Sequence, residues 1–203
     1  MIKKIKQKIK DKLYIFFEAY FKNKDQIEYR KLKNSFKKVG DNFSVGKDYT
    51  VKNAQYIEIG RNFLALDRFR IEAWDKYRNQ DFKPYIKIGD NVIFNTDIHI
   101  GCINSITIGD NCLFASRIFI TDHYHGDTSF EMLKLAPKDR DLVSKGAVII
   151  KNNVWVGEGV GIMPNVTIGE NSIIAMNAVV TKDVPPNCVV AGVPASIIKY
   201  LNV

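Results

Sequence analysis

"VWVGEGVGIMPNVTIGENSIIAMNAVV", residues 154–180, places an aliphatic residue at every sixth position. The clearest run is Val156, Ile162, Ile168, Ile174 and Val180, and most of these residues are followed by glycine or another small or polar residue. A period of six suits neither a helix nor an ordinary hairpin, and it is typical of parallel β-helix repeats. Each unit then forms a short strand and a turn, and three units make one coil, so that equivalent aliphatic residues stack into a continuous core. We therefore predict an all-β solenoid.

The same period extends upstream and is interrupted at defined places. Runs begin at Ile88 and Ile108, and fragments between residues 45 and 60 continue the pattern toward the N-terminus. Equivalent residues are 18 apart in the regular coils, but Ile88 and Ile108 are 20 apart, and Ile108 and Ile150 are 42 apart. We therefore expect 2 extra residues near residue 104 and an insertion of 24 residues between residues 121 and 146. Residues 72–85 form another excursion, and such insertions in solenoids commonly build the binding face.

Residues 1–38 differ from the rest of the chain in periodicity and charge. Apolar residues recur at steps of three and four with lysines between them, which predicts an amphipathic helix. The members of this apolar stripe are Ile2, Ile5, Ile9, Leu13, Phe16, Phe17 and Tyr20. The net charge of +8 is concentrated in this segment and the remainder is close to neutral, which argues against a nucleic-acid-binding body. The basic helix either lies on an anionic membrane surface or packs its stripe against its own domain or a neighbouring subunit.

The length and composition fit one soluble globular domain of 203 residues. No stretch approaches the roughly 20 apolar residues of a membrane span. The apolar part near the N-terminus is interrupted by Glu18 and has no small-residue cleavage site, which argues against a signal peptide. Cys102, Cys112 and Cys188 show no CxxC spacing, so we expect reduced, buried thiols. These features predict a cytoplasmic protein, with the N-terminal helix as the candidate for peripheral contact at the inner membrane face.

Four motifs in the last coils carry a family likeness: "NNVWVG" (152–157), "IMPNVTIGENS" (162–172), "AVVTKDVPPN" (178–187) and "AGVPA" (191–195). With them, the chain resembles the hexapeptide-repeat acyltransferases, in particular the maltose, galactoside and nodulation-factor O-acetyltransferases and their relatives in capsule and lipopolysaccharide biosynthesis. The resemblance implies a left-handed parallel β-helix, a homotrimer with active sites between subunits, and acetyl-CoA as acyl donor. We expect the β-helix to span residues 39–195 with a protruding loop at about 122–147. A helical extension at 1–38 and a C-terminal tail at 196–203 flank it.

The histidines of "TDHYHG", residues 121–126, are the candidates for the general base that the resemblance implies. Histidine titrates near neutral pH, so it can take a proton from the acceptor hydroxyl as its oxygen attacks the thioester. Counting without gaps from "IGDN" (108–111) places the family's histidine at His125, whereas the "DHxH" pattern of some relatives places it at His123. In an extended segment both side chains point to one side, with Asp122 and Tyr124 opposite. We therefore do not expect Asp122 to orient His123.

Other residues match binding positions of the family. Asn95 matches an asparagine near the acceptor, and Trp155 matches a tryptophan near the active-site channel. The positions that match the acetyl-CoA site are Gly157, Glu158, Met176, Thr181, Lys182 and Lys199. Main-chain groups of flat coils can bind the pantetheine, and lysines suit the nucleotide phosphates. Purely structural roles, as a corner asparagine, an interface tryptophan or a solvated lysine, stay open for Asn95, Trp155 and Lys182.

We predict an acetyl-CoA-dependent O-acetyltransferase that acts on a sugar hydroxyl of a cell-surface glycan or its precursor. An N-acetyltransferase of an amino-sugar nucleotide is the alternative within the same enzyme class. A metal enzyme of the carbonic-anhydrase type would need His99, His123 and His125 to converge. Because His99 belongs to an earlier coil and the acetyl-CoA signature would go unexplained, we predict no metal site. A non-catalytic scaffold is the third alternative.

Overall fold

The structure is a computed structural model that describes residues 2–201, without the side chains of residues 2–6, 8, 9, 21, 22 and 25. The chain forms two compact units, residues 1–35 and residues 36–203. The first unit is helix α1 (Ile2–Ser35), so the predicted helical extension ends three residues before residue 38. Leu13, Phe16, Phe17 and Tyr20 of the predicted stripe are at least half exposed. The side chains of Ile2, Ile5 and Ile9 lie outside the described residues.

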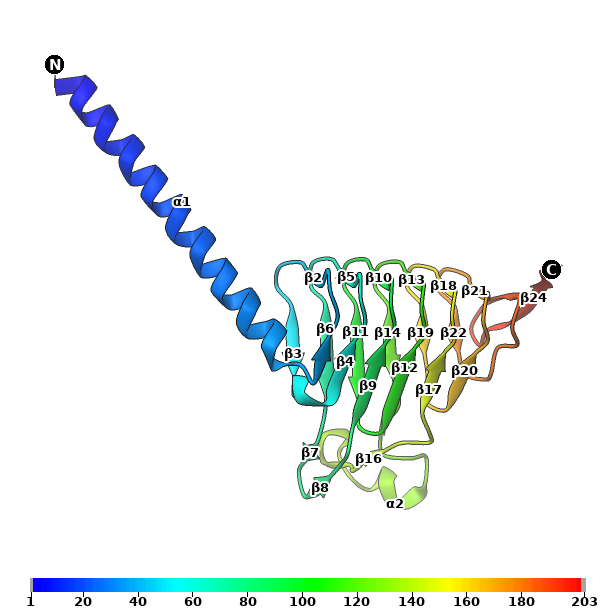
Figure 1. Ribbon diagram of the computed structural model, residues 1–203. Coiled ribbons are helices and arrows are strands. Elements are labelled where there is room, and N and C mark those ends of the chain that lie inside the picture. Colours follow the sequence, from blue (N-terminus) through cyan, green and yellow to red (C-terminus); the bar gives the residue numbers. More distant parts are fainter. Residues whose placement is uncertain (1, 202–203) are drawn as a thin grey trace. The chain divides into compact units, whose positions relative to one another are not determined.

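The second unit is a three-sided parallel β-helix, which confirms the predicted solenoid (Figure 1). The first sheet contains β1 (Lys38–Val39), β4 (Ile57–Ile59), β9 (Tyr85–Ile88), β12 (Ser105–Ile108), β17 (Val148–Ile150) and β20 (Val166–Ile168). The second sheet contains β2 (Ser44–Val45), β5 (Leu64–Ala65), β10 (Ile93–Phe94), β13 (Leu113–Phe114), β18 (Trp155–Val156), β21 (Ile173–Ile174), β23 (Cys188–Ala191) and β24 (Ser196–Tyr200). The third sheet contains β3 (Thr50–Lys52), β6 (Arg70–Ala73), β11 (His99–Cys102), β14 (Phe119–Thr121), β19 (Gly161–Ile162) and β22 (Val179–Val180).

The register of the coils is the one that the six-residue period predicts. Ile150 pairs with Ile168, and Ile162 pairs with Val180, as expected for coils of 18 residues. The interrupted coils also pair as expected, because Ile108 lies between Ile88 and Ile150 in the first sheet. These inward aliphatic side chains are almost completely buried. The core therefore runs as a continuous column through the coils, and burial of this apolar surface is the main stabilising term.

Asparagines form a ladder at the corner between the first and second sheets. The ladder consists of Asn42, Asn62, Asn91, Asn111, Asn153, Asn171 and Asn187. Each has a positive φ between 55° and 59°, a conformation that asparagine tolerates better than most residues. The side-chain amide of each of the first six donates to the side-chain oxygen of the next member, at nitrogen–oxygen distances of 2.7–3.2 Å. The ladder thus satisfies the polar groups of the turn while fixing its backbone.

The C-terminal segment corrects the predicted domain boundaries. Residues 196–200 form β24, which pairs antiparallel with β23 and so belongs to the second sheet instead of a separate tail. Residues 202 and 203 of the predicted tail lie outside the described residues. At the other end, β1 begins at Lys38, one residue before the predicted start of the β-helix. The N-terminal coils, which carry the weakest repeat signal, are complete parallel coils.

The two excursions from the coils lie side by side and make one lobe (Figure 1). The first leaves the β-helix after β6 and contains the hairpin of β7 (Lys76–Tyr77) and β8 (Gln80–Asp81). In the preceding coil, the short η1 (Ala54–Tyr56) follows β3 at the equivalent place. The second contains β15 (Tyr124–His125), α2 (Phe130–Leu133), η2 (Pro137–Asp139) and β16 (Leu142–Val143), and β15 pairs with β16. The Tyr77 hydroxyl donates to the carbonyl of Lys138 (3.0 Å), and Gln80 exchanges two hydrogen bonds with the backbone of Leu142 (2.7 and 3.2 Å).

Within residues 2–201, no helix combines the length and the apolar character that crossing a bilayer would require.

Candidate active site

Two rows of outward positions on the third sheet form the floor of the candidate site. Ile71, Ile100 and Ile120 point into the core, so the residues before and after each of them point outward. The first outward row is Arg70, His99 and Phe119, and the second is Glu72, Gly101 and Thr121. Outward residues of a β-helix are ordinarily solvated, yet Glu72 is only 6% exposed and Thr121 only 4%. The lobe of the two excursions covers them.

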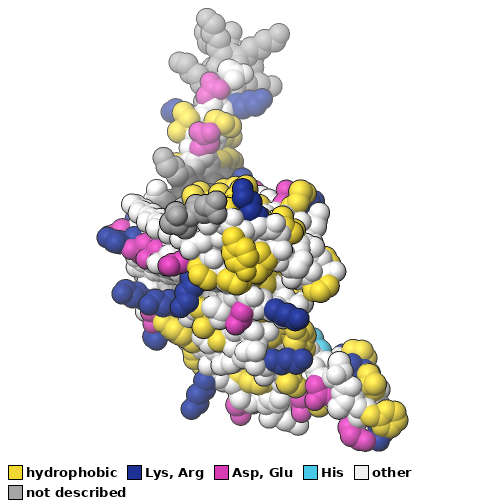
Figure 2. Space-filling view, turned by 90° about the vertical axis from the view of Figure 1, so that its right-hand side faces the viewer, with side chains coloured by type: hydrophobic (Ala, Val, Ile, Leu, Met, Phe, Trp, Pro, Cys, Tyr) yellow, Lys and Arg dark blue, Asp and Glu magenta, His cyan; other side chains and the backbone are white. Residues whose placement is uncertain are grey.

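A cavity of about 230 Å³ lies between this floor and the lobe. The lobe contributes Trp74, Tyr77, His123, His125 and Leu142 to its walls. In the space-filling view, histidine is visible where the lobe joins the body of the molecule (Figure 2). Both excursions predicted to build a binding face therefore meet at one cavity that contains the predicted catalytic histidines.

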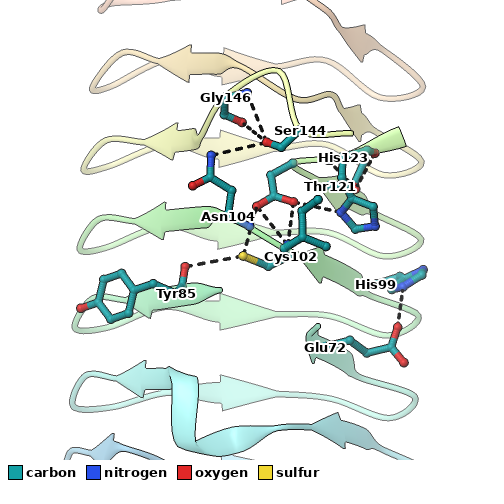
Figure 3. Close-up of polar contacts among 11 residues, drawn as sticks. Glu72, Tyr85, His99, Cys102, Asn104, Thr121, His123, Ser144 and Gly146 are labelled. Carbon is teal, nitrogen blue, oxygen red and sulfur yellow. Dashed lines mark hydrogen bonds and ion pairs between the residues drawn. The ribbon is translucent and has the colours of Figure 1, made fainter. Parts of the chain in front are cut away.

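His123 and Asp122 form an imidazole–carboxylate pair, which corrects one expectation. The Nδ1 atom of His123 lies 2.9 Å from Oδ1 of Asp122 and 3.2 Å from the Thr121 hydroxyl oxygen (Figure 3). The expectation that Asp122 cannot orient His123 is wrong because strand β14 ends at Thr121, and the alternation of side chains ends with it. With Nδ1 engaged by Asp122, Nε2 is the nitrogen left to act in the cavity.

Asp122 is held by four donors in a fully buried position. Its carboxylate accepts hydrogen bonds from the N–H groups of Ile103 (2.9 Å) and Asn104 (2.8 Å), from the Cys102 thiol (3.2 Å) and from His123. Burial alone would raise the pKa of Asp122, but the hydrogen bonds from His123, Ile103, Asn104 and Cys102 outweigh it and lower the pKa below its usual value. Burial and the Asp122 carboxylate raise the pKa of the Cys102 thiol, which remains protonated as a donor.

His125 has a different environment from His123. Its ring packs edge-on against the ring of Tyr77, with 5.6 Å between the centroids. The residue lies on β15, where its backbone pairs with Leu142, and it is exposed. The two histidines of "TDHYHG" therefore share the cavity, but one is oriented by a buried carboxylate and the other by an aromatic side chain of the first excursion.

The third histidine also lies in this cavity, which the sequence analysis did not predict. His99 Nε2 is 3.3 Å from the Glu72 carboxylate, which also forms an ion pair with Arg70 at 2.8 Å. Burial lowers the pKa of His99 below its usual value, and the neighbouring Arg70 guanidinium lowers it further. Although all three histidines line one cavity, the described residues include no group of three His, Cys, Asp or Glu side chains arranged to hold a metal ion.

Sequence analysis did not find Arg70 and Glu72, because their place beside His99 depends on the strand register of a coil of irregular length. His99 lies 29 residues after Arg70 in the parallel pairing of β6 and β11. That spacing includes the excursion at 72–85, so it cannot be read from a period of 18 or 20. Only the observed strand pairing brings these side chains together.

The predicted acceptor residues Asn95 and Trp155 do not line this cavity. Asn95 follows β10 on the second sheet, where its N–H donates to the carbonyl of Phe114 (2.9 Å). Trp155 points outward from β18 and is 51% exposed. It continues an outward apolar row on the same sheet that includes Ile93 and Leu113, both also exposed.

The predicted acetyl-CoA residues occupy three places. Gly157, Glu158 and Met176 lie near the corner between the second and third sheets, where a Cβ on Gly157 would approach the Met176 nitrogen to 2.7 Å and Glu158 pairs with Arg117 at 2.6 Å. Thr181 and Lys182 line a second cavity of about 430 Å³ beside the first sheet. Lys199 lies on β24. A single chain thus places the predicted donor residues apart from the histidine cavity.

Comparison with known proteins identifies the family. Residues 147–182 match the family model for the bacterial transferase hexapeptide (six repeats). A protein of Escherichia coli strain K12, described as a putative lipopolysaccharide biosynthesis O-acetyl transferase, is 37% identical over 155 residues, which cover 75% of this chain and 76% of that protein.

Solved structures of two related enzymes share the fold. A maltose O-acetyltransferase from Clostridium difficile 630 superposes with a TM-score of 0.55 at 29% identity, over 85% of this chain and 73% of that one. A galactoside acetyltransferase in complex with coenzyme A superposes with a TM-score of 0.54 at 31% identity, over 87% of this chain and 72% of that one.

Proposed function

Because the chain belongs to the hexapeptide-repeat transferase family, we propose that it is an acetyl-CoA-dependent O-acetyltransferase that acts on a sugar hydroxyl. Relatives with this fold bind coenzyme A, and the matched relatives are named O-acetyltransferases of lipopolysaccharide biosynthesis and of galactosides. The observation that carries the proposal is the pair of His123 and buried Asp122 at the edge of a cavity large enough for a small acceptor.

His123 acts as the general base in this proposal. Its Nε2 takes the proton of the acceptor hydroxyl while the hydroxyl oxygen attacks the thioester carbonyl of acetyl-CoA. The tetrahedral intermediate then collapses, the carbon–sulfur bond breaks, and the departing thiolate takes the proton from the imidazolium. The products are the acetyl ester and free CoA. Asp122 holds the imidazole in the tautomer with a free Nε2 and stabilises the imidazolium that forms.

The surroundings of the two histidines favour His123 over His125 for this role. The side chain of His123 is 13% exposed and its Asp122 partner is completely buried, so their interaction is little screened by water. His125 is exposed and packs against Tyr77. We assign His125 to the wall of the acceptor cavity.

The donor site and the remaining acceptor contacts require a second subunit in our proposal. The family resemblance implies a left-handed β-helix that assembles as a homotrimer with active sites between subunits. The outward apolar row of Ile93, Leu113 and Trp155 supports such an interface, because three neighbouring exposed apolar side chains on one sheet favour burial against a partner. Assembly would bring Asn95 and Trp155 of one subunit toward the histidines of another.

The same assembly would form the acetyl-CoA site. The residues assigned to it are Gly157, Glu158, Met176, Thr181, Lys182 and Lys199. The half-open cavity at Thr181 and Lys182 supports the contact with the donor's phosphate-bearing end, because the lysine ammonium attracts phosphate.

We assign the acceptor to a cell-surface glycan or its precursor, and helix α1 to peripheral contact with an anionic membrane. Exposed Leu13, Phe16, Phe17 and Tyr20 lie on one face of α1, and lysines flank them. A basic helix with exposed aromatic and aliphatic residues is suited to the interface between lipid headgroups and acyl chains. Such contact would place the enzyme at the cytoplasmic face of the membrane, beside lipid-linked sugars.

A transfer assay distinguishes the proposal from its alternatives. The purified chain is incubated with acetyl-CoA and either hexopyranosides that carry only hydroxyl groups or amino-sugar nucleotides, and free CoA and acetylated products are measured. The proposal expects products whose acetyl group is removed by mild base, as for an ester. Base-stable products formed from amino sugars alone would instead establish the N-acetyltransferase, and coenzyme A binding without any transfer would establish a scaffold.

A further inference from the structure

Gly101 occupies the centre of the cavity floor. In the third sheet it lies between Glu72 on β6 and Thr121 on β14, and it follows His99 by two residues on the same outward side. Adjacent strands are about 4.8 Å apart, so the backbones of Glu72 and Thr121 are separated by about 9.6 Å. The missing side chain at Gly101 therefore leaves a hollow between two imidazole–carboxylate pairs, His123–Asp122 on one side and His99–Glu72 on the other.

Both imidazole rings border the hollow. A Cβ atom placed on Gly101 would lie 3.4 Å from Cε1 of His123 and 3.8 Å from Nε2 of His99. These are ordinary van der Waals distances, so an alanine would fit sterically at this position. Its methyl group would nevertheless occupy the space that separates the two rings. The backbone of Gly101 is not in the left-handed conformation that favours glycine, so backbone geometry does not explain why a glycine stands at this position.

Glu72 places a carboxylate beside this hollow. Its side chain is 8% exposed, and it is one of four buried polar or charged residues in the described part of the chain. Arg70 balances its charge at 2.8 Å, and burial lowers the pKa of His99, which favours its neutral form. The floor therefore has no net charge and offers acceptor oxygens of Glu72, which suits an uncharged polyhydroxylated ligand better than an anion.

Aromatic side chains make the wall above the hollow. Trp74 and Tyr77 lie in edge contact with 6.4 Å between their ring centroids, and both line the cavity with Leu142. Aromatic rings present a flat apolar surface together with polar groups at their edges. Such a surface fits the apolar face of a pyranose ring. A cavity of about 230 Å³ is smaller than the pockets of about 300–1,000 Å³ that hold drug-sized ligands, so it suits one sugar residue.

From this arrangement we infer that Gly101, Glu72 and His99 form the acceptor subsite and select an uncharged terminal pyranose. The reacting hydroxyl enters the hollow at Gly101 beside His123, and a second hydroxyl of the same ring donates to the Glu72 carboxylate. This inference rests on the proposed O-acetyltransferase function and adds the part of the chain that determines the acceptor.

Gly101→Ala and Gly161→Ala provide a matched pair to test the hollow. Gly161 lies on the same sheet and faces outward, its added Cβ would lie 3.4 Å from the flexible end of Met163, and it does not line the cavity. Both variants are assayed with hexopyranosides of gluco, galacto and manno configuration, and acetyl-CoA binding is measured by calorimetry. We expect Gly101→Ala to lower kcat/KM for the acceptor by about 10- to 100-fold, the effect of a lost or displaced polar contact in the site. Gly161→Ala is expected to remain within threefold of the wild type, and both variants to bind acetyl-CoA normally.

Glu72→Gln tests the second hydroxyl contact with monodeoxy versions of the best hexopyranoside. One deoxy sugar should be a poor acceptor for the wild-type enzyme, and Glu72→Gln should discriminate much less between that sugar and its parent. A purely structural role of Glu72 would lower both rates equally. If the wild type acetylates a hexopyranoside while Gly101→Ala is as active as Gly161→Ala, the subsite is wrong and the proposed function stands. If the wild type transfers acetyl to no hydroxyl, both are wrong.

Discussion

Substitution of Asp122 by asparagine removes the charge behind His123 with almost no change in volume. Oδ1 of Asp122 accepts from the Ile103 N–H and from His123, whereas Oδ2 accepts from the Asn104 N–H and the Cys102 thiol; the Ile103 N–H also reaches Oδ2, at the longer distance of 3.3 Å. Asparagine has one oxygen, so it can serve only one of these two pairs of donors. Its amide NH₂ must then face the other pair, donor against donor, inside a region without solvent.

The expected loss of stability follows from the two hydrogen bonds that asparagine cannot accept. Hydrogen bonds to charged groups contribute about 1.5–3 kcal/mol each, so the unfolding free energy should fall by about 3–6 kcal/mol. In a domain of this size that corresponds to a decrease in Tm of about 6–24 °C. The transfer rate should fall further, by about 100- to 10,000-fold, because the imidazole loses the acceptor that fixes its tautomer.

Asp110→Asn is the matched control for this experiment. The Asp110 carboxylate accepts from the Asp90 N–H at 2.8 Å, and one coil later Asn152 accepts from the Asp110 N–H at 2.9 Å in the same way. The chain therefore already uses asparagine in this role, and Asp110→Asn should shift Tm by less than about 3 °C. Calorimetry and acetyl-transfer rates, measured well below both transitions, separate the two effects. A variant Asp122→Asn with wild-type Tm and a rate within threefold of the wild type would refute the assignment of Asp122.

Three other predictions concern acid stability, the asparagine ladder and the N-terminal helix. Because the pKa of Asp122 is lowered in the folded protein, its contribution to stability is complete above the unfolded value of about 4 and is lost as the pH falls through the folded value. The difference in unfolding free energy between wild type and Asp122→Asn should therefore narrow below about pH 4; a difference that does not narrow would contradict this. Asn111→Ala should lower the unfolding free energy, measured by denaturant titration, by about 2–3 kcal/mol, because it removes two ladder hydrogen bonds and places alanine in a left-handed backbone conformation. Asn111→Gly should lower it clearly less, because glycine adopts that conformation freely. Equal losses in the two variants would contradict the backbone contribution. Wild-type protein should sediment more with phosphatidylserine vesicles than with phosphatidylcholine vesicles. The double variant Phe16→Ser and Phe17→Ser should bind phosphatidylserine vesicles at least tenfold more weakly than the wild type. Equal binding of the double variant and the wild type would rule out this face of α1 as the contact.

The repeat period was sufficient to predict the coils because burial of one aliphatic residue per strand dictates the register. The spacings of Ile88, Ile108 and Ile150 located the irregular coils correctly, and the strand pairing confirms them. The two excursions were also located, but their meeting through Tyr77 and Gln80 depends on folded loops that carry no period. Sequence periodicity therefore located the two excursions that line the candidate site without giving their arrangement.

The polar arrangement of the site was not predictable from alternation or spacing. Asp122 reaches His123 because the strand ends at Thr121, and a strand end of two or three residues is beyond what a period can indicate. His99 reaches Glu72 through a coil whose length includes an excursion. Asn95 and Trp155 lie on another sheet of the same chain, so any role at the histidine cavity depends on a neighbouring subunit.

The rate of acetyl transfer by His123→Ala, compared with that of His125→Ala, tests directly whether His123 is the general base. Both variants are incubated with acetyl-CoA and the best hexopyranoside acceptor, and acetyl-CoA affinity is measured in parallel. We predict that His123→Ala lowers kcat by at least about 100-fold while it binds acetyl-CoA with the wild-type Kd, and that His125→Ala retains kcat within about tenfold. Full activity of His123→Ala, with or without loss of activity in His125→Ala, would contradict the assignment of His123 as the base.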